Sequence, residues 1–140
     1  MIEIVDTSAW AWRERDVDVR SEVDRLIEGR RAATCEPVAL ELLYSARNLR
    51  DFRALRARLG VLVQCPVSEV AWTRAFEVYE ALAAQGGAHQ RQVKHMDLLI
   101  AAAAETAGVG LLHCDEDFDR IVKVTGQPAR WASPSTSRPP

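Results

Sequence analysis

Five acidic residues stand at points of the sequence where they could be brought together to do chemistry. One follows a short apolar run at the start of the chain, and two follow another apolar run near residue 112. A fourth opens a strongly helix-favouring segment, and the fifth lies inside an earlier helical segment. They are Asp6, Glu41, Asp97, Asp115 and Asp117. In a parallel sheet with right-handed crossovers, such positions converge at the edge formed by the strands' carboxyl ends.

Converging carboxylates need a counter-charge. Two of them about 4 Å apart repel by roughly 4 kcal/mol at an effective dielectric constant of 20, so three or four require a cation or bound protons. Hard oxygen ligands favour Mg²⁺, with Mn²⁺ as a substitute, over zinc. A carboxylate-held Mg²⁺ keeps waters that can be activated or replaced by phosphate oxygens, which is the chemistry of phosphodiester hydrolysis.

Each acid also has a purely structural interpretation, which the sequence leaves open. Asp is a leading N-cap residue, so Asp6, Asp97 and Asp115 can each serve only to cap or begin a helix. Asp117 can be a solvated helix acid, and Glu41 can be a partly buried residue among apolar neighbours.

The sequence lacks the motifs of other kinds of functional site. The sequence contains neither G-x-x-x-x-G-K-[ST] nor G-x-G-x-x-G, so both nucleotide-binding fingerprints are missing. His89, His95 and His113 show no zinc-ligand spacing. Ser8 is not part of a G-x-S-x-G elbow, so we interpret it as a supporting hydroxyl or a helix cap rather than a nucleophile.

The elements that must position the acids alternate along the chain. Apolar runs predict strands at residues 2–5, 31–35, 61–63 and 111–113, with a short edge strand at 129–131. Helices are predicted at residues 9–15, 19–27, 37–43, 52–59, 70–84, 96–107 and 115–124. This alternation predicts an α/β three-layer sandwich with a mainly parallel central sheet. We expect a single domain over residues 1–132 and a flexible Ser/Pro-rich tail over residues 133–140.

Composition favours a cytoplasmic protein. Its three cysteines, Cys35, Cys65 and Cys114, are odd in number and are expected to be reduced thiols. No basic leader opens the chain, and the longest apolar run, residues 98–104, is too short to span a bilayer. With 18 basic against 20 acidic residues, overall charge indicates no particular partner.

Four segments, taken in order, resemble the PIN domain and, within it, the VapC-type toxins of bacterial toxin–antitoxin pairs. They are Ile-Val-Asp-Thr-Ser-Ala at 4–9, Glu41, Met-Asp-Leu-Leu-Ile-Ala-Ala at 96–102 and Asp-Glu-Asp-Phe at 115–118. The set extends over nearly the whole chain, from residue 2 to residue 121.

The resemblance implies a metal-dependent endoribonuclease, the toxin of a type II pair. Its acidic pocket would consist of Asp6, Glu41, Asp97 and Asp115, with Asp117 as an additional or alternative metal ligand and Ser8 hydrogen-bonded within the pocket. In the family's pattern the first and third of these acids hold Mg²⁺, while the second and fourth complete the site or orient the attacking water. An RNA substrate, a homodimer and a cognate antitoxin whose C-terminal segment covers the site are also implied.

An RNA substrate would need basic groups beside an acidic pocket. One predicted amphipathic stretch carries five arginines against a single acid between residues 47 and 58. Candidate phosphate contacts are Arg47, Arg50 and Arg53 in this stretch, and Arg91 and Lys94 shortly before Asp97. A solvated helix face explains the arginines equally well.

The sequence departs from the family's pattern at two points, and three alternative functions remain. His113 stands where many relatives have Thr, and the tail has no counterpart in the family's pattern. The first alternative is a PIN-like nuclease in RNA processing or acting on DNA, the second is a catalytically inactive binding module, and the third is a receiver-like signalling domain. A receiver-like signalling domain would need an Asp after the third strand, and none follows residues 61–66.

Overall fold

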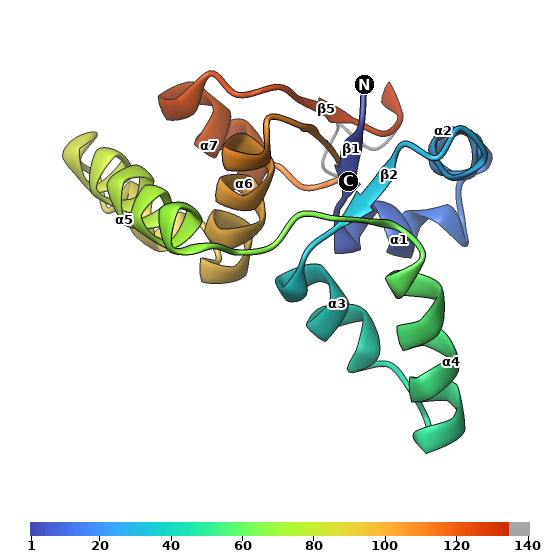
Figure 1. The fold of residues 1–140 in the computed structure, drawn as a ribbon. Helices are drawn as coiled ribbons and strands as arrows, with labels where there is room; N and C mark the ends of the chain where they lie inside the picture. Colours follow the sequence, from blue (N-terminus) through green and yellow to red (C-terminus); the bar gives the residue numbers. More distant parts are fainter. Residues whose placement is uncertain (135–140) are drawn as a thin grey trace.

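A computed structural model, which describes residues 1–134, has a five-stranded parallel sheet at its centre (Figure 1). The strands are β1 (Glu3–Val5), β2 (Ala32–Thr34), β3 (Val63–Gln64), β4 (Gly110–His113) and β5 (Ala129–Trp131). They are ordered β3-β2-β1-β4-β5, and every neighbouring pair is parallel. The predicted α/β sandwich is confirmed, with a sheet that is parallel throughout.

Helices cover both faces of this sheet. They are α1 (Thr7–Arg13), α2 (Val17–Glu28), α3 (Glu36–Leu43), α4 (Leu49–Gly60), α5 (Glu69–Ala84), α6 (His95–Ala107) and α7 (Asp117–Thr125), with a 3₁₀ turn, η1 (His89–Gln92). Strand residues alternate between two cores, as the period of two requires. Ile4 packs in the core with α5, α6 and α7, whereas the next residue, Val5, packs in the core with α1 and α2.

The third strand begins later than the sequence pattern predicts. Helix α4 continues through Gly60, and the Val61 amide still donates to the Arg58 carbonyl in αR geometry. Val61 is therefore 85% exposed, and β3 starts only at Val63. The apolar run was correctly identified, but its first residue belongs to the end of the helix.

The predicted tail lies mostly outside the described residues. Ser133 is described and buried, whereas residues 135–140 are not described. Within residues 1–134, no helix is long and apolar enough to cross a membrane.

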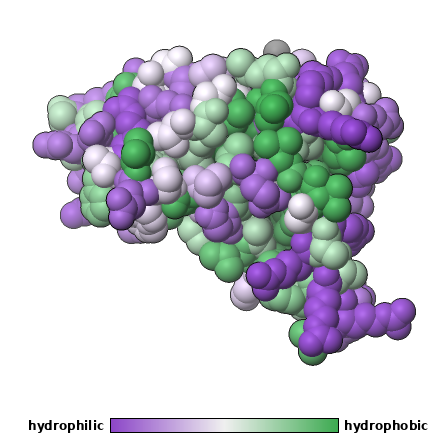
Figure 2. All heavy atoms as spheres, in the orientation of Figure 1, coloured by the Kyte–Doolittle hydropathy of each residue, from purple (hydrophilic) through white to green (hydrophobic). Residues whose placement is uncertain are grey.

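Helices α3 and α4 form a hairpin that projects away from the sheet (Figure 1). Its lower end is mainly hydrophilic (Figure 2). The arginines predicted as phosphate contacts, Arg47, Arg50 and Arg53, are exposed on this hairpin.

Candidate active site: an acidic pocket at the carboxyl edge of the sheet

Asp6 follows the central strand β1 and begins helix α1. Its Oδ2 accepts hydrogen bonds from the backbone amide and the hydroxyl of Ser8, so Asp6 is the N-cap of that helix. Its other oxygen, Oδ1, is buried without a hydrogen-bond partner among the described residues. Burial, reinforced by the charges of Glu41 and Asp115, raises the pKa of Asp6 to about 6, despite the two hydrogen bonds from Ser8. Capping thus uses only one of the two oxygens.

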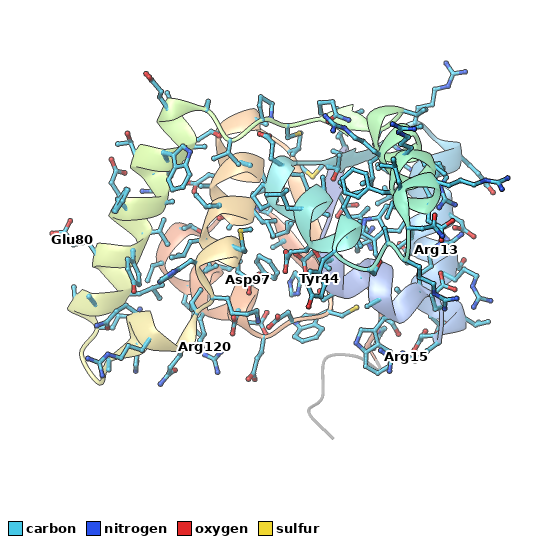
Figure 3. The ribbon with its side chains drawn as sticks, turned by 90° about the horizontal axis from the view of Figure 1, so that it is seen from below. Arg13, Arg15, Tyr44, Glu80, Asp97 and Arg120 are labelled. Carbon is cyan, nitrogen blue, oxygen red and sulfur yellow. The ribbon has the colours of Figure 1, made fainter. Side chains whose placement is uncertain are left out.

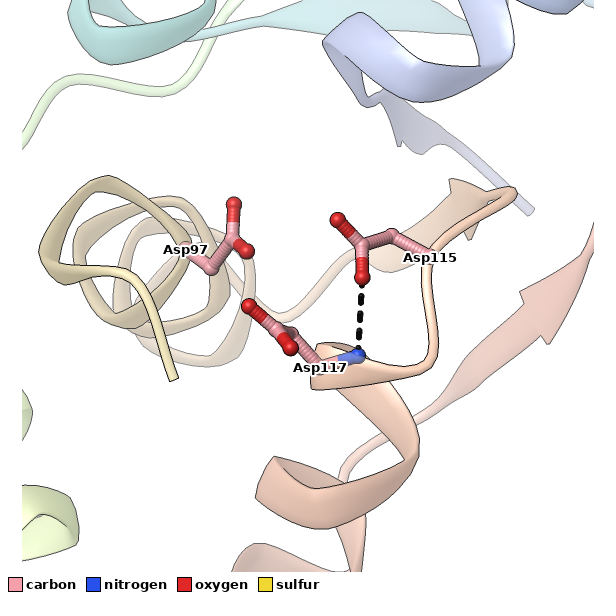
Figure 4. A group of neighbouring side chains, drawn as sticks. All are labelled: Asp97, Asp115 and Asp117. Atoms are coloured by element: carbon pink, nitrogen blue, oxygen red, sulfur yellow. Dashed lines mark hydrogen bonds between the residues drawn. The ribbon is translucent and has the colours of Figure 1, made fainter. Parts of the chain in front are cut away.

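Three further aspartates meet beside β4 (Figure 4). Asp97 lies in the first turn of α6, Asp115 follows β4, and Asp117 begins α7. One carboxylate oxygen from each lies within 4.8 Å of the other two. The Asp117 amide donates to Asp115 Oδ1 at 2.9 Å, which fixes the loop between them.

The pKa values of Asp97 and Asp117 are shifted in opposite directions by their surroundings. Both side chains are buried. Burial raises the pKa of Asp97, and a hydrogen bond shared with Asp117 and the charge of Asp6 add to this. Burial also opposes ionisation of Asp117, but its hydrogen bonds with Asp97 and with Lys94 outweigh burial and lower its pKa. Of the two carboxyl groups, Asp97 therefore has the higher pKa and is the more easily protonated.

The ammonium group of Lys94 lies among these acids. Its Nζ is 2.8 Å from Asp115 Oδ2 and 3.1 Å from Asp117 Oδ2. Asp97 Oδ2 is 3.3 Å away, an ion-pair distance without hydrogen-bond geometry. Burial lowers the pKa of Lys94, but the hydrogen bonds to Asp115 and Asp117 prevail and raise it. Arg120 binds the other oxygen of Asp117 at 2.8 Å.

Two neutral side chains hold the loop that carries Asp115. Ser8 Oγ accepts a hydrogen bond from the Cys114 amide at 2.9 Å, which ties this loop to the first turn of α1. His113 Nδ1 accepts from the Asp115 amide at 3.2 Å. Burial lowers the pKa of His113 to about 4, so the ring is neutral and acts as an acceptor.

Glu41 approaches the pocket from helix α3. Its Oε1 accepts a hydrogen bond from the Thr7 hydroxyl at 3.0 Å, and its side chain is half-buried. Its charge acts on Asp6, so the two acids are neighbours. Figure 3 shows this edge from below, with Asp97 near its centre and Arg120 to one side.

The structure thus brings the five predicted acids to one edge of the sheet. Ser8 lies among them, in the supporting position that was expected. Arg91 is exposed in η1, whereas Lys94 lies against the acids rather than apart from them. Thr7, Arg120 and the acceptor role of His113 were not predicted from the sequence. Thr7, adjacent to the first acid, and His113, where many relatives have Thr, gave a sequence signal, whereas Arg120 gave none.

The donor set suits a hard divalent cation. The cluster offers carboxylate oxygens from three aspartates, and the unpartnered Oδ1 of Asp6 adds a fourth candidate ligand. All are oxygen donors, the type that Mg²⁺ and Mn²⁺ prefer. The position of the Lys94 ammonium indicates independently that this point of the pocket attracts positive charge.

Comparison with known sequences places the chain in a family. The PIN domain matches residues 4–124. The chain belongs to the PIN domain family. Among curated PIN relatives, Ribonuclease VapC18 of Mycobacterium tuberculosis is 42% identical over 134 residues, 96% of this chain and 97% of the relative. Ribonuclease VapC21 of the same species is 38% identical over 136 residues, 96% of each chain.

Solved PIN structures share the fold at lower sequence identity. DNA-bound VapBC from Salmonella typhimurium has a TM-score of 0.72 at 18% identity, covering 95% of this chain and 100% of that chain. VapBC-1 from nontypeable Haemophilus influenzae has a TM-score of 0.73 at 17% identity, covering 94% and 98%. Both matches extend over almost the whole of this chain.

Proposed function

We propose that this protein is a Mg²⁺-dependent endoribonuclease that hydrolyses RNA phosphodiester bonds as the toxin of a type II toxin–antitoxin pair. The observation that carries the proposal is a cluster of carboxylates at the carboxyl edge of a PIN sheet. Full-length similarity to relatives named ribonucleases supports it.

Four aspartates would hold the metal: Asp6, Asp97, Asp115 and Asp117. Asp6 has a buried oxygen that no described residue satisfies, and the other three already converge. When bound, a divalent metal supplies an activated water and offsets charge that develops on the phosphate.

The remaining residues of the pocket would position and accept protons. Glu41 is held by the Thr7 hydroxyl beside Asp6 and is half-buried, so its carboxylate can orient the attacking water or accept its proton. Ser8 and His113 keep Asp6 and the Asp115 loop in register. Their neutrality adds no charge to a pocket that must receive a phosphate.

Basic side chains would bind the rest of the RNA. Arg47, Arg50 and Arg53 are exposed on the hairpin of α3 and α4, and Arg91 is exposed on η1. Contacts of this kind supply affinity through phosphate charge and carry no base preference.

A cognate antitoxin is the proposed protein partner. The structural relatives include VapBC complexes, among them a member of the VapBC family of toxin–antitoxin systems from Mycobacterium tuberculosis. Leu40, on the helix that carries Glu41, is 61% exposed, and Tyr44, directly after that helix, is 92% exposed, which offers an apolar approach to the pocket. A homodimer is also proposed, with Trp72 and Phe76, exposed on α5, as candidate contacts.

The test is cleavage of a mixed small-RNA pool by the full-length protein, purified free of antitoxin. Wild type, Asp97→Asn and the surface control Asp18→Asn are compared with Mg²⁺ and with EDTA. We expect cleavage by wild type and the control in Mg²⁺ only, and none by Asp97→Asn. Cleavage that persists in EDTA or in Asp97→Asn contradicts the proposal. Absence of cleavage in every sample favours a binding module.

A further inference from the structure

The Lys94 ammonium occupies the point where three carboxylates meet. Its Nζ lies 2.8 Å from Asp115, 3.1 Å from Asp117 and 3.3 Å from Asp97. These three residues are the ones whose oxygens converge closely enough to hold a metal ion. Lys94 therefore contacts the same three carboxyl groups that would hold a divalent cation.

An ammonium and a divalent cation cannot share these oxygens. Mg²⁺ binds its ligands at about 2.0–2.1 Å and demands near-octahedral geometry, and two cations held by the same oxygens repel each other. We propose that Lys94 is a resident counter-cation of the acidic pocket, which competes with the divalent metal for Asp115 and Asp117 and so sets the metal affinity. This inference rests on the proposed function only in taking the pocket as the metal site.

The pocket is built to keep its shape when the ammonium leaves. Asp117 Oδ1 is held by Arg120 at 2.8 Å, and its Oδ2 also accepts from the backbone amide of Lys94 at 3.2 Å. Asp115 Oδ1 is held by the Asp117 amide at 2.9 Å. None of these contacts uses the ammonium group, so the carboxylates stay in place without it.

The lysine side chain is also free to move. It is 62% exposed, and Lys94 is the residue that precedes α6. The ammonium can therefore move into solvent without disturbing the core. A flexible four-carbon stem makes that movement easy. The competition is accordingly moderate and reversible, and it discriminates against cations too weakly bound to displace an ammonium.

The chain provides a matched control, because Lys94 and Lys123 are its only two lysines. Lys123 is exposed on α7. We would titrate Mg²⁺ and Mn²⁺ calorimetrically into full-length wild type, Lys94→Met and Lys123→Met. We expect Lys94→Met to bind Mg²⁺ roughly tenfold more tightly, equivalent to about 1.4 kcal/mol, and Lys123→Met to stay within about twofold of wild type. Equal or weaker binding by Lys94→Met overturns the inference.

Wild-type protein provides a second measurement that does not depend on the folding of a variant. Lysine-selective labelling gives one side-chain NMR signal from Lys94 and one from Lys123. Adding Mg²⁺ should shift the Lys94 signal, with the Lys123 signal unchanged as an internal reference. Saturation with Mg²⁺ while the Lys94 signal stays fixed refutes the competition.

The two proposals fail in distinguishable ways. If no variant binds either metal, the metal site of the proposed function fails, and this inference fails with it. If all three proteins bind metal with the same affinity, the metal site stands and only the role of Lys94 is wrong.

Discussion

Replacing Asp6 by Asn should stabilise the fold while removing a metal ligand. Burial raises the pKa of Asp6 from an ordinary 3.8 to about 6. One pKa unit corresponds to about 1.4 kcal/mol, so the ionised carboxylate costs the folded state about 3 kcal/mol. Asn caps helices as well as Asp does, so the N-cap of α1 should be retained.

The pH dependence of this effect follows from linkage. Because the folded-state pKa of Asp6 lies above the unfolded value, the penalty is absent below about pH 4. It grows between pH 4 and 6 and is complete above pH 6. A buried amide nitrogen without a good partner costs about 1–3 kcal/mol, so the expected net gain above pH 7 is at most about 2 kcal/mol.

Urea unfolding in EDTA at pH 4.5 and pH 8 measures the effect. The exposed substitution Asp18→Asn serves as the control and should change the free energy of unfolding by less than about 0.5 kcal/mol at either pH. Asp6→Asn should exceed wild type in stability at pH 8 and lose that advantage at pH 4.5. A variant less stable than wild type at pH 8, or a gain that is the same at both pH values, refutes the reasoning.

Three further predictions concern the surroundings of the pocket. His113→Leu removes the acceptor for the Asp115 amide. It should lower the free energy of unfolding in urea by about 1 kcal/mol and weaken Mn²⁺ binding several-fold. Unchanged Mn²⁺ affinity would count against a positioning role for His113. Arg130→Met breaks a bidentate ion pair with buried Glu3, whose two hydrogen bonds are 2.8 and 2.9 Å long, and should destabilise the fold by about 2 kcal/mol. Adding Glu3→Gln should recover part of this loss. No recovery would mean that the unpaired charge of Glu3 does not cause the destabilisation. Mg²⁺ at 100 times its Kd should raise the free energy of unfolding by about 2.7 kcal/mol, seen as a higher melting temperature in wild type but not in Asp97→Asn.

The sequence was most informative where short-range chemistry decides structure. Glu3–Val5 form a buried strand within the predicted run, in which Ile4 and Val5 are β-branched and apolar and the run is too short for a helix, and the acid that follows caps the next helix. Parallel pairing of β1 with β4 then brings Asp6 and Asp115 to the same edge, as the crossover rule predicts. The fold and the convergence of the acids were therefore predictable.

Details that depend on side-chain packing were not predictable. The start of β3 was placed two residues early because Val61 has strand propensity but ends a helix. Lys94 was assigned to phosphate binding because sequence proximity does not reveal where a long side chain settles. His113 appeared only as a departure from the family's pattern, since its hydrogen bond to the Asp115 amide depends on the loop that follows β4.

The central claim is that the carboxylates of the pocket bind the divalent metal on which RNA cleavage depends. Crystals of the full-length protein, from a preparation whose cleavage requires Mn²⁺, would be soaked in Mn²⁺ and examined by anomalous diffraction. We predict an anomalous peak bound by Asp97 and its neighbouring aspartates, with the Lys94 ammonium moved away from Asp115. A peak elsewhere, or none in this pocket at a Mn²⁺ concentration that supports full cleavage, would contradict the account.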